Sequence, residues 1–427
     1  MSVITTSRQQ RWRAALSVLA NRNFVLLWIG TGLNSLGRAV LSIALMKLIY
    51  DQTGSASGVG LLVFTNIFSM VIVTPVGGVL TDRLDRKKLL IAIGVLRAMS
   101  TLFFLWARSP LAIYVVNFVL SAITTLSFPV GSAVVPDIVN KEQLLDANAL
   151  NMSLSTLAMV FGPLLGGFIV DRFSLQAVFI LSGALFFLAA LGVFLVRIPP
   201  SSLLRGEATL RAVYEEFVEG ARYARVNVVV STLTIIYLLF LTGLGIKMGL
   251  DVVFAERVLS GEALSTSTAY SYLTSAGSLG LFIGSLLVRY LGRRFAKKQL
   301  LLVGLGMACL DTLGLAFIRS LPLALTAKFA SGLGGGLSDS IWPTMLQEHV
   351  EEDQRGRAYS LFMSVVTIPP AITVYLGGWL ADRTSLQLVY GLAGGWVLLT
   401  AIGSHFLPGY RAIPAHSEEA KSGDHDQ

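Results

Sequence analysis

Long apolar runs separated by short polar segments dominate the chain. Each run has roughly the 20 residues that a helix needs to cross the hydrocarbon core of a bilayer. The runs form two groups of six, at residues 24–49, 58–80, 89–107, 111–135, 147–170, 174–196, 228–250, 266–290, 299–318, 321–346, 358–380 and 386–407. The pattern therefore predicts an all-α membrane protein with twelve transmembrane helices in two six-helix halves.

The remaining segments complete the predicted domain organisation. Residues 1–23 form an N-terminal arm, residues 24–196 the first half and residues 228–407 the second half. In the middle loop, 197–227, apolar residues recur at helical spacing opposite a charged face, which predicts an amphipathic helix on the membrane surface. We expect the polar tail, 408–427, to be disordered.

Composition narrows the class of protein. Hydrophobic residues make up 54% of the chain and charged residues 14%, whereas soluble domains are about a quarter charged. This composition excludes a disordered protein or a nucleic-acid binder, and it argues against a water-soluble enzyme. The single cysteine, Cys309, lies in an apolar run, and the four histidines lack metal-ligand spacing. We expect no metal, no cofactor and no enzymatic activity, because no nucleophile–base pair or phosphate-binding loop is visible.

The charges in the loops predict the orientation in the membrane. The net charge is +8, and lysine and arginine concentrate in the N-terminal arm, the middle loop and every second short loop. The loops on the other side carry one arginine each. The positive-inside rule therefore predicts that both termini and the middle loop of this multi-pass protein are cytoplasmic.

The two halves of the chain share an internal repeat. Residues 166–176 read GGFIVDRFSLQ and residues 377–387 read GGWLADRTSLQ, displaced by 211 residues, close to half the chain. Duplicated six-helix halves related by a pseudo-two-fold axis are a transporter architecture, with the binding site between the halves near the middle of the membrane.

A charged motif follows the second apolar run. Residues 78–87 read GVLTDRLDRK, which resembles the signature G-x-x-x-D-R-x-G-R-K of the major facilitator superfamily, with Asp85 where glycine is more common. Together with the stretches 21–24 and 136–139, this variant resembles the bacterial exporter branch that includes macrolide-efflux and enterobactin-export proteins. The resemblance covers about residues 21–405 and implies a twelve-helix transporter that works as a monomer.

The same motif predicts a cytoplasmic gate. Asp82 ends a helix, where its negative charge opposes the helix dipole, so we expect it to pair with an arginine or with the N-terminus of another helix. Arg97 is the candidate partner. A pair that forms in one conformation and breaks in the other acts as a gate, to which we assign Gly78, Asp82, Arg83, Arg86 and Arg97.

A second motif lies in the fifth run. Gly162, Pro163, Gly166 and Gly167 resemble the superfamily motif G-P-x-x-G-G, which is associated with exporters. Glycines permit close helix contact, and proline removes a backbone hydrogen bond. We expect a pliable helix at the interface between the halves, although small-residue packing alone would explain the same residues.

Charged side chains inside the apolar runs are functional candidates, because each costs at least about 2.5 kcal/mol at the centre of a bilayer. They are Arg38, Lys47, Arg97, Lys247, Asp251, Asp311, Lys328 and Asp339. In the superfamily fold, the helices that hold six of these eight line the cavity. We assign the substrate cavity to Arg38, Asn66, Asn117, Lys247, Lys328 and Asp339.

The proton-coupling candidates are the three acids among these charged residues. Asp339 comes first, because it lies eleven residues from Lys328 and therefore on nearly the same helix face. Asp251 comes second; it and Lys247 lie four residues apart on one helix face near the outer membrane surface, where both could reach water and serve a structural role instead. Asp311 is expected to be neutral and hydrogen-bonded.

These features predict a secondary exporter that moves an amphiphilic small molecule outward in exchange for protons, with membrane lipids as its surroundings. The cavity-lining charges are four positive and two negative, so we expect an anionic substrate held by Arg38 and Lys328. One alternative is a lysophospholipid or lipid translocator of the same fold. A second alternative is a membrane sensor or scaffold that does not transport.

Overall fold

The computed structural model describes residues 17–197, 227–261, 264–350, 355–407 and 409–410, without the side chains of 75–76, 78–83, 128, 355–361 and 363–364. The amphipathic helix predicted for the middle loop lies outside the described residues, as do most of the N-terminal arm and nearly all of the polar tail.

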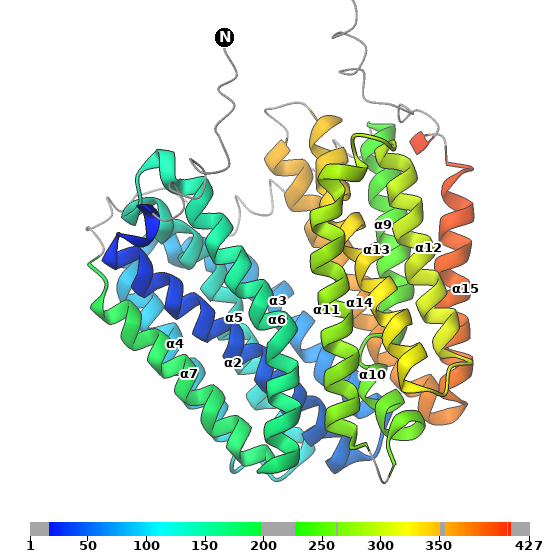
Figure 1. The fold of residues 1–427 in the computed structure, drawn as a ribbon, viewed down its shortest axis with the longest axis horizontal. Helices are drawn as coiled ribbons and strands as arrows, with labels where there is room; N and C mark the ends of the chain where they lie inside the picture. Colours follow the sequence, from blue (N-terminus) through cyan, green and yellow to red (C-terminus); the bar gives the residue numbers. More distant parts are fainter. Residues whose placement is uncertain (1–16, 198–226, 262–263, 351–354, 408, 411–427) are drawn as a thin grey trace, which may run out of the picture. The chain divides into compact units, whose positions relative to one another are not determined.

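The first six predicted runs are helices. They are α2 (Arg22–Thr53), α3 (Ala56–Arg83), α4 (Arg86–Phe103), α5 (Pro110–Ile138), α6 (Leu144–Arg172) and α7 (Leu175–Leu195), with a 3₁₀ turn at Lys141–Gln143. Figure 1 shows them in blue to green.

The six runs of the second half are also helical. They are α9 (Val228–Lys247) with α10 (Leu250–Phe254), α11 (Thr266–Leu291), α12 (Lys297–Leu315), α13 (Leu321–Glu348), α14 (Arg355–Arg383) and α15 (Leu386–Ser404). One predicted helix, 228–250, is broken between α9 and α10, and a π-helical turn, η2 (Ala255–Leu259), follows α10.

Contacts divide the chain into two units, 1–48 with 69–210 and 49–68 with 211–427. The end of α2 and the first part of α3 therefore cluster with the second unit. The two units share one set of helix contacts. The third helix packs on the sixth and on the fourth in each, α4 on α7 and α5, and α12 on α15 and α13. This shared arrangement is what a duplicated six-helix half predicts.

Serines of the repeat begin the last helix of each half. Ser174 accepts a hydrogen bond from the backbone N–H of Ala177 at 3.1 Å, and Ser385 accepts one from Leu388 at 3.2 Å. Each hydroxyl satisfies one of the N–H groups that a helix leaves unpaired in its first turn. The repeated sequence therefore performs the same structural task twice.

Ten of the described helices are long and apolar enough to cross a membrane. Two of the twelve predicted crossings, α4 and α13, fall outside this set by composition. The 18 residues of α4 include four basic side chains, and α13 includes Lys328, Asp339 and several glycines. Both helices pack against helices that belong to the set, α4 on α5 and α7, and α13 on α11 and α12.

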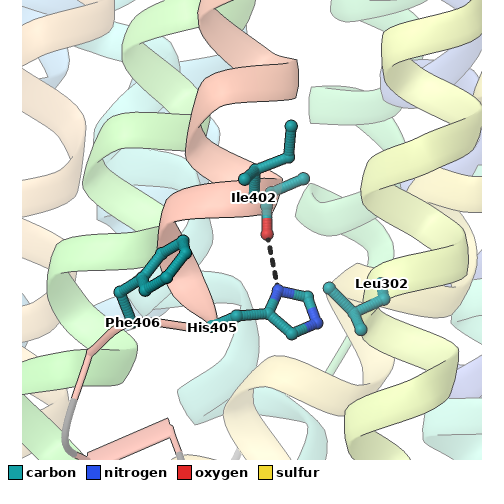
Figure 2. Close-up of a pocket in the computed structure, with 5 residues that line it drawn as sticks. Leu302, Ile402, His405 and Phe406 are labelled. Carbon is teal, nitrogen blue, oxygen red and sulfur yellow. Dashed lines mark hydrogen bonds between the residues drawn. The ribbon is translucent and has the colours of Figure 1, made fainter.

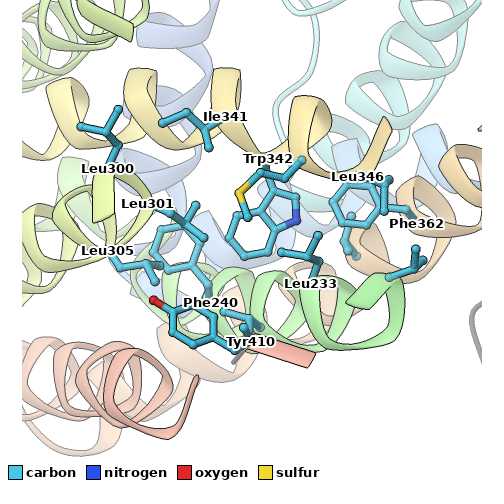
Figure 3. Packing of buried hydrophobic residues seen from close by; sticks show 14 of the residues in the cluster. Leu233, Phe240, Leu300, Leu301, Leu305, Ile341, Trp342, Leu346, Phe362 and Tyr410 are labelled. Carbon is cyan, nitrogen blue, oxygen red and sulfur yellow. The ribbon is translucent and has the colours of Figure 1, made fainter. Parts of the chain in front are cut away.

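A buried cluster of the second unit surrounds Trp342 (Figure 3). Leu233 and Phe240 from α9, Leu301 from α12 and Phe362 from α14 surround its indole ring. Full burial of such side chains is worth roughly 1.5–3 kcal/mol each relative to exposure to water. This core holds α9, α12, α13 and α14 together beside the charged residues described next.

Candidate functional site

Four charged side chains meet inside the second unit. Lys247 ends α9, Asp251 lies in α10, Asp311 in α12 and Lys328 in α13. Lys247 Nζ donates to Asp311 Oδ2. Lys328 Nζ lies 2.6 Å from Asp251 Oδ1 and 3.9 Å from Asp311 Oδ2. We call these four residues the ion cluster.

The ion cluster is electrically balanced, with two lysines and two aspartates. The side chain of Asp311 is fully buried, and those of Lys328 and Lys247 are 9% and 11% exposed. Burial of an unpaired charge costs several kcal/mol, so such charges persist only when paired. Asp251 differs, because 30% of its side chain is exposed. The ion cluster therefore reaches from a fully buried carboxylate to a partly exposed one.

A break in the seventh predicted helix creates this arrangement. Gly249 has φ +88°, in the left-handed region that glycine adopts at little cost. It ends α9 at Lys247 and redirects the chain into α10. Lys247 also lies in the last turn of α9, where the helix dipole favours a cation. The prediction that Lys247 and Asp251 share one helix face was wrong, because the helix does not continue between them.

One other expectation about these charges was also wrong. Asp311 was expected to be neutral, but Lys247 and Lys328 both face its carboxylate. Lys328 and Asp339 were predicted to lie on nearly the same helix face, and the partners of Lys328 in the structure are Asp251 and Asp311. Helical spacing placed Lys328 and Asp339 near one wall, but the packing of α10 and α12 supplied closer acids.

Asp339 has a different setting on α13. Its carboxylate is exposed and accepts a hydrogen bond from the hydroxyl of Tyr237 at 3.5 Å. The ring of Tyr237 packs against Trp342 and Phe362, with centroid distances of 4.7 and 5.2 Å. Trp342 and Phe362 are buried, so of these rings only that of Tyr237 is partly exposed beside Asp339.

The predicted cavity residues of the first six-helix half lie on separate helices. Arg38 is exposed on α2, and Asn117 is buried in α5. Asn66 is partly buried in α3, in the segment that clusters with the second unit. Arg97 is buried, donates to Asn34 Oδ1 at 3.0 Å and lies 4.1 Å over the ring of Phe186.

Part of the predicted cytoplasmic gate is described. Arg86 Nη1 lies 2.8 Å from Asp137 Oδ2 at the end of α5 and also donates to the carbonyl of Ala133. Asp85 accepts from the N–H of Lys88 and so begins α4. The side chains of Gly78, Asp82 and Arg83 lie outside the described residues, so the pairing of Asp82 with Arg97 stays a prediction.

The glycine–proline motif lies in α6, where Gly162, Pro163, Gly166 and Gly167 are all buried. A Cβ on Gly162 would lie 2.4 Å from that of Ala39, and one on Gly166 would lie 2.8 Å from the carbonyl oxygen of Val40. Gly162 and Gly166 thus allow α6 to touch α2 within the first unit, whereas the motif led us to expect contact between the halves.

A shallow apolar pocket of about 460 Å³ lies between α12 and α15 (Figure 2). Its lining is Leu302, Ala401, Ile402, His405 and Phe406, and His405 Nδ1 is 3.1 Å from the carbonyl oxygen of Ala401. Leu302 precedes Asp311 by nine residues on α12, about 13 Å along the axis. Because the lining is almost wholly apolar, we assign the substrate elsewhere.

Sequence reasoning missed one member of the site. The hydroxyl of Tyr390, in α15, donates to Asp251 Oδ1 at 3.4 Å, and its side chain is fully buried. A tyrosine inside an apolar run resembles any other packing residue, so the sequence carried no signal for this contact.

Comparison with known proteins agrees with this fold. A family model described as Major Facilitator Superfamily matches residues 27–259 and 240–426. Macrolide efflux protein A of Streptococcus pyogenes is 23% identical over 89% of this chain and 94% of its own length. The multidrug efflux pump Tap of Mycolicibacterium fortuitum is 22% identical over 90% of this chain and 95% of its own length.

A solved structure of the nucleoside transporter NupG superposes with a TM-score of 0.74 at 13% identity. The superposition covers 90% of this chain and 98% of that one. At this identity the likeness concerns the fold alone. The family match spans nearly the whole chain and agrees with the charged motif at 78–87 and the internal repeat. The chain therefore belongs to the major facilitator superfamily and is a membrane transporter.

Proposed function

We propose that this protein is a secondary exporter that moves an amphiphilic small molecule out of the cell while protons move in. The family, together with relatives named as efflux proteins, supports transport and its direction. The observation that carries the proton step is the position of Lys328, 2.6 Å from Asp251 and 3.9 Å from Asp311. A lysine between two acids can exchange one partner for the other.

Asp251 is the proton carrier in this proposal, in place of Asp339. Its side chain is 30% exposed, so a proton can reach it from water. Once protonated, Asp251 no longer attracts Lys328, whose ammonium group then moves toward Asp311. One proton thereby changes the ion pairs that join α10, α12 and α13. Asp339 lacks this coupling, because its described hydrogen bond is to Tyr237.

The ion pairs change which cations could attract an anionic substrate. Lys247 and Lys328 counted toward a positive cavity, but both are ion-paired with aspartates. Of the two other cations in that count, Arg38 and Lys47, Arg38 is the more exposed, and it is the cation that would meet an anionic group of the substrate. We therefore propose that Arg38→Ala weakens transport of anionic compounds and leaves that of cationic compounds unchanged.

The cellular setting follows from the same family and from the loop charges. We propose a multi-pass monomer in a bacterial inner membrane, with both termini in the cytoplasm. The relatives are bacterial, and the basic loops lie on the side of the termini.

The test uses purified protein in liposomes with an imposed pH gradient and an internal pH-sensitive dye. Erythromycin, ethidium and an anionic catecholate chelator serve as probes. We expect Asp251→Asn to abolish probe-induced proton movement while probe binding persists. Asp339→Asn is the matched control, the same change in an acid outside the ion cluster, and should retain coupling.

The reverse result, with coupling lost in Asp339→Asn and kept in Asp251→Asn, would return the proton step to Asp339. If no probe moves protons in the unsubstituted protein, export of soluble compounds by proton exchange is wrong. A lipid translocator would then be the next function to test, with a fluorescent lysophospholipid.

A further inference from the structure

The first turn of α3 is held by a residue more than 300 positions away. Asp382, at the end of α14, accepts hydrogen bonds from the backbone N–H groups of Ala56 at 2.7 Å and Ser57 at 2.9 Å. It also accepts one from the hydroxyl of Ser57 at 2.6 Å. The hydroxyl of Ser55 satisfies the next N–H, that of Gly58.

This carboxylate satisfies the two N–H groups, those of Ala56 and Ser57, that precede the one capped locally by Ser55. The first N–H groups of a helix have no partner within the helix, and they carry the positive end of its dipole. A nearby serine or aspartate normally satisfies them. Here α14 supplies the negative charge, so the start of α3 and the end of α14 stabilise each other only while they touch.

The backbones of the two helices approach closely. A Cβ on Gly378 would lie 2.4 Å from the carbonyl oxygen of Ala56, and one on Gly60 would lie 2.7 Å from that of Val374. Any side chain at these positions would force the helices apart. The contact is therefore a closed seam, into which no bulky group fits.

A second residue holds the end of α2 at the same place. Arg257, in the π-helical turn η2, has Nη2 3.6 Å from Asp382 Oδ1 and donates from Nε to the hydroxyl of Tyr50 at 3.3 Å. Tyr50 is buried. The segment 49–68 clusters with the second unit, although it belongs to the first half of the repeat. Asp382 and Arg257 supply the polar contacts of this attachment.

We infer that Asp382 is a gate residue of the transport cycle, which holds the connection between α2 and α3 against the end of α14 in one state and releases it in the other. The loop charges predict that this connection lies on the outer face of the membrane. The inference rests on the proposed transport, because a gate requires two alternating states. Its members are exposed enough for water to replace their hydrogen bonds when the seam opens, as the 22% exposure of the Asp382 side chain indicates.

The experiment measures the seam directly and needs no substrate. One spin label is attached at Gln52→Cys, near the end of α2, and the other at Gln387→Cys, in the first turn of α15, both in a Cys309→Ala background. Double electron–electron resonance in lipid nanodiscs then reports the distance between these two labels. Both label sites are exposed. After the competing hydrogen bonds to water are subtracted, hydrogen bonds to a charged group are still strong enough to change the ratio of closed to open seam by at least about tenfold.

We expect Asp382→Asn to raise the ratio of long to short distances about tenfold or more. Ser57→Ala, which removes only the hydroxyl contact, should shift the ratio in the same direction by less. Arg383→Gln is the matched control, since Arg383 adjoins Asp382 but stacks on Trp379 of its own helix at 4.0 Å. It should leave the distances unchanged.

An unchanged distribution in Asp382→Asn would overturn the inference, and so would an equal shift in Arg383→Gln, which would indicate general loosening. A clear shift in Asp382→Asn with no transport of any probe would support the gate and count against the proposed exporter. The two proposals therefore fail by different results.

Discussion

Removal of the Asp311 charge is the strongest test of the ion cluster. Asp311→Asn keeps the shape of the side chain but leaves the buried Lys247 without the carboxylate to which it donates. Lys328 keeps Asp251 at 2.6 Å. The substitution therefore strands one buried cation and spares the other pair.

The expected loss is large. Breaking a buried ion pair by removing one partner costs about 3–5 kcal/mol, because the remaining charge stays in a low dielectric. For a unit of roughly 200 residues, 1 kcal/mol changes the melting temperature by about 2–4 °C. We therefore expect Asp311→Asn to lower the melting temperature by roughly 6–20 °C.

The chain contains its own reporter for this measurement. Cys309 is the only cysteine, is buried and lies two residues from Asp311 on α12. A dye that fluoresces on reaction with thiols will therefore report the unfolding of this region as detergent-solubilised protein is heated.

Two further variants separate charge from shape. The double variant Lys247→Met/Asp311→Leu removes both charges of the pair, so its melting temperature should return near that of the unsubstituted protein, since apolar replacement of a buried pair is often neutral or stabilising. Asp251→Asn should cost less than Asp311→Asn, because Lys328 retains Asp311 at 3.9 Å. If Asp311→Asn melts like the unsubstituted protein, or if the double variant melts no higher than Asp311→Asn, the ion pair does not stabilise this region.

Three other substitutions test local features. Gly249→Ala should lower the free energy of unfolding by about 1–2 kcal/mol, because a residue with a side chain is disfavoured at φ +88°. An unchanged melting temperature in the thiol-dye assay would contradict this. Gly166→Val should cost about 1–3 kcal/mol by overpacking against Val40, measured by circular dichroism on heating, and stability equal to the unsubstituted protein would mean that α6 and α2 can separate freely. Arg86→Ala should lower the free energy of unfolding by only about 1 kcal/mol, because its ion pair with Asp137 is partly exposed. In the same circular dichroism measurement, a loss of several kcal/mol would show that this ion pair stabilises the protein more than its exposure suggests.

Local patterns in the sequence determined the helices and their duplication. Runs of apolar residues as long as a bilayer is thick can satisfy their backbone groups only as helices, so all twelve runs were predicted. The repeat at 166–176 and 377–387 predicted two similar halves, and Ser174 and Ser385 begin equivalent helices in them. The motif at 78–87 indicated the family that the comparisons then showed.

Only the tertiary structure decided which charges meet. Lys247 and Asp311 are 64 residues apart, Lys328 and Asp251 are 77 apart, and Asp382 is 326 residues from Ala56. Helical spacing relates residues within one helix, and it failed here because the chain breaks at Gly249 and neighbouring helices offer closer partners. A buried charge pairs with whatever opposite charge the packing brings within reach, and that choice depends on how the helices pack.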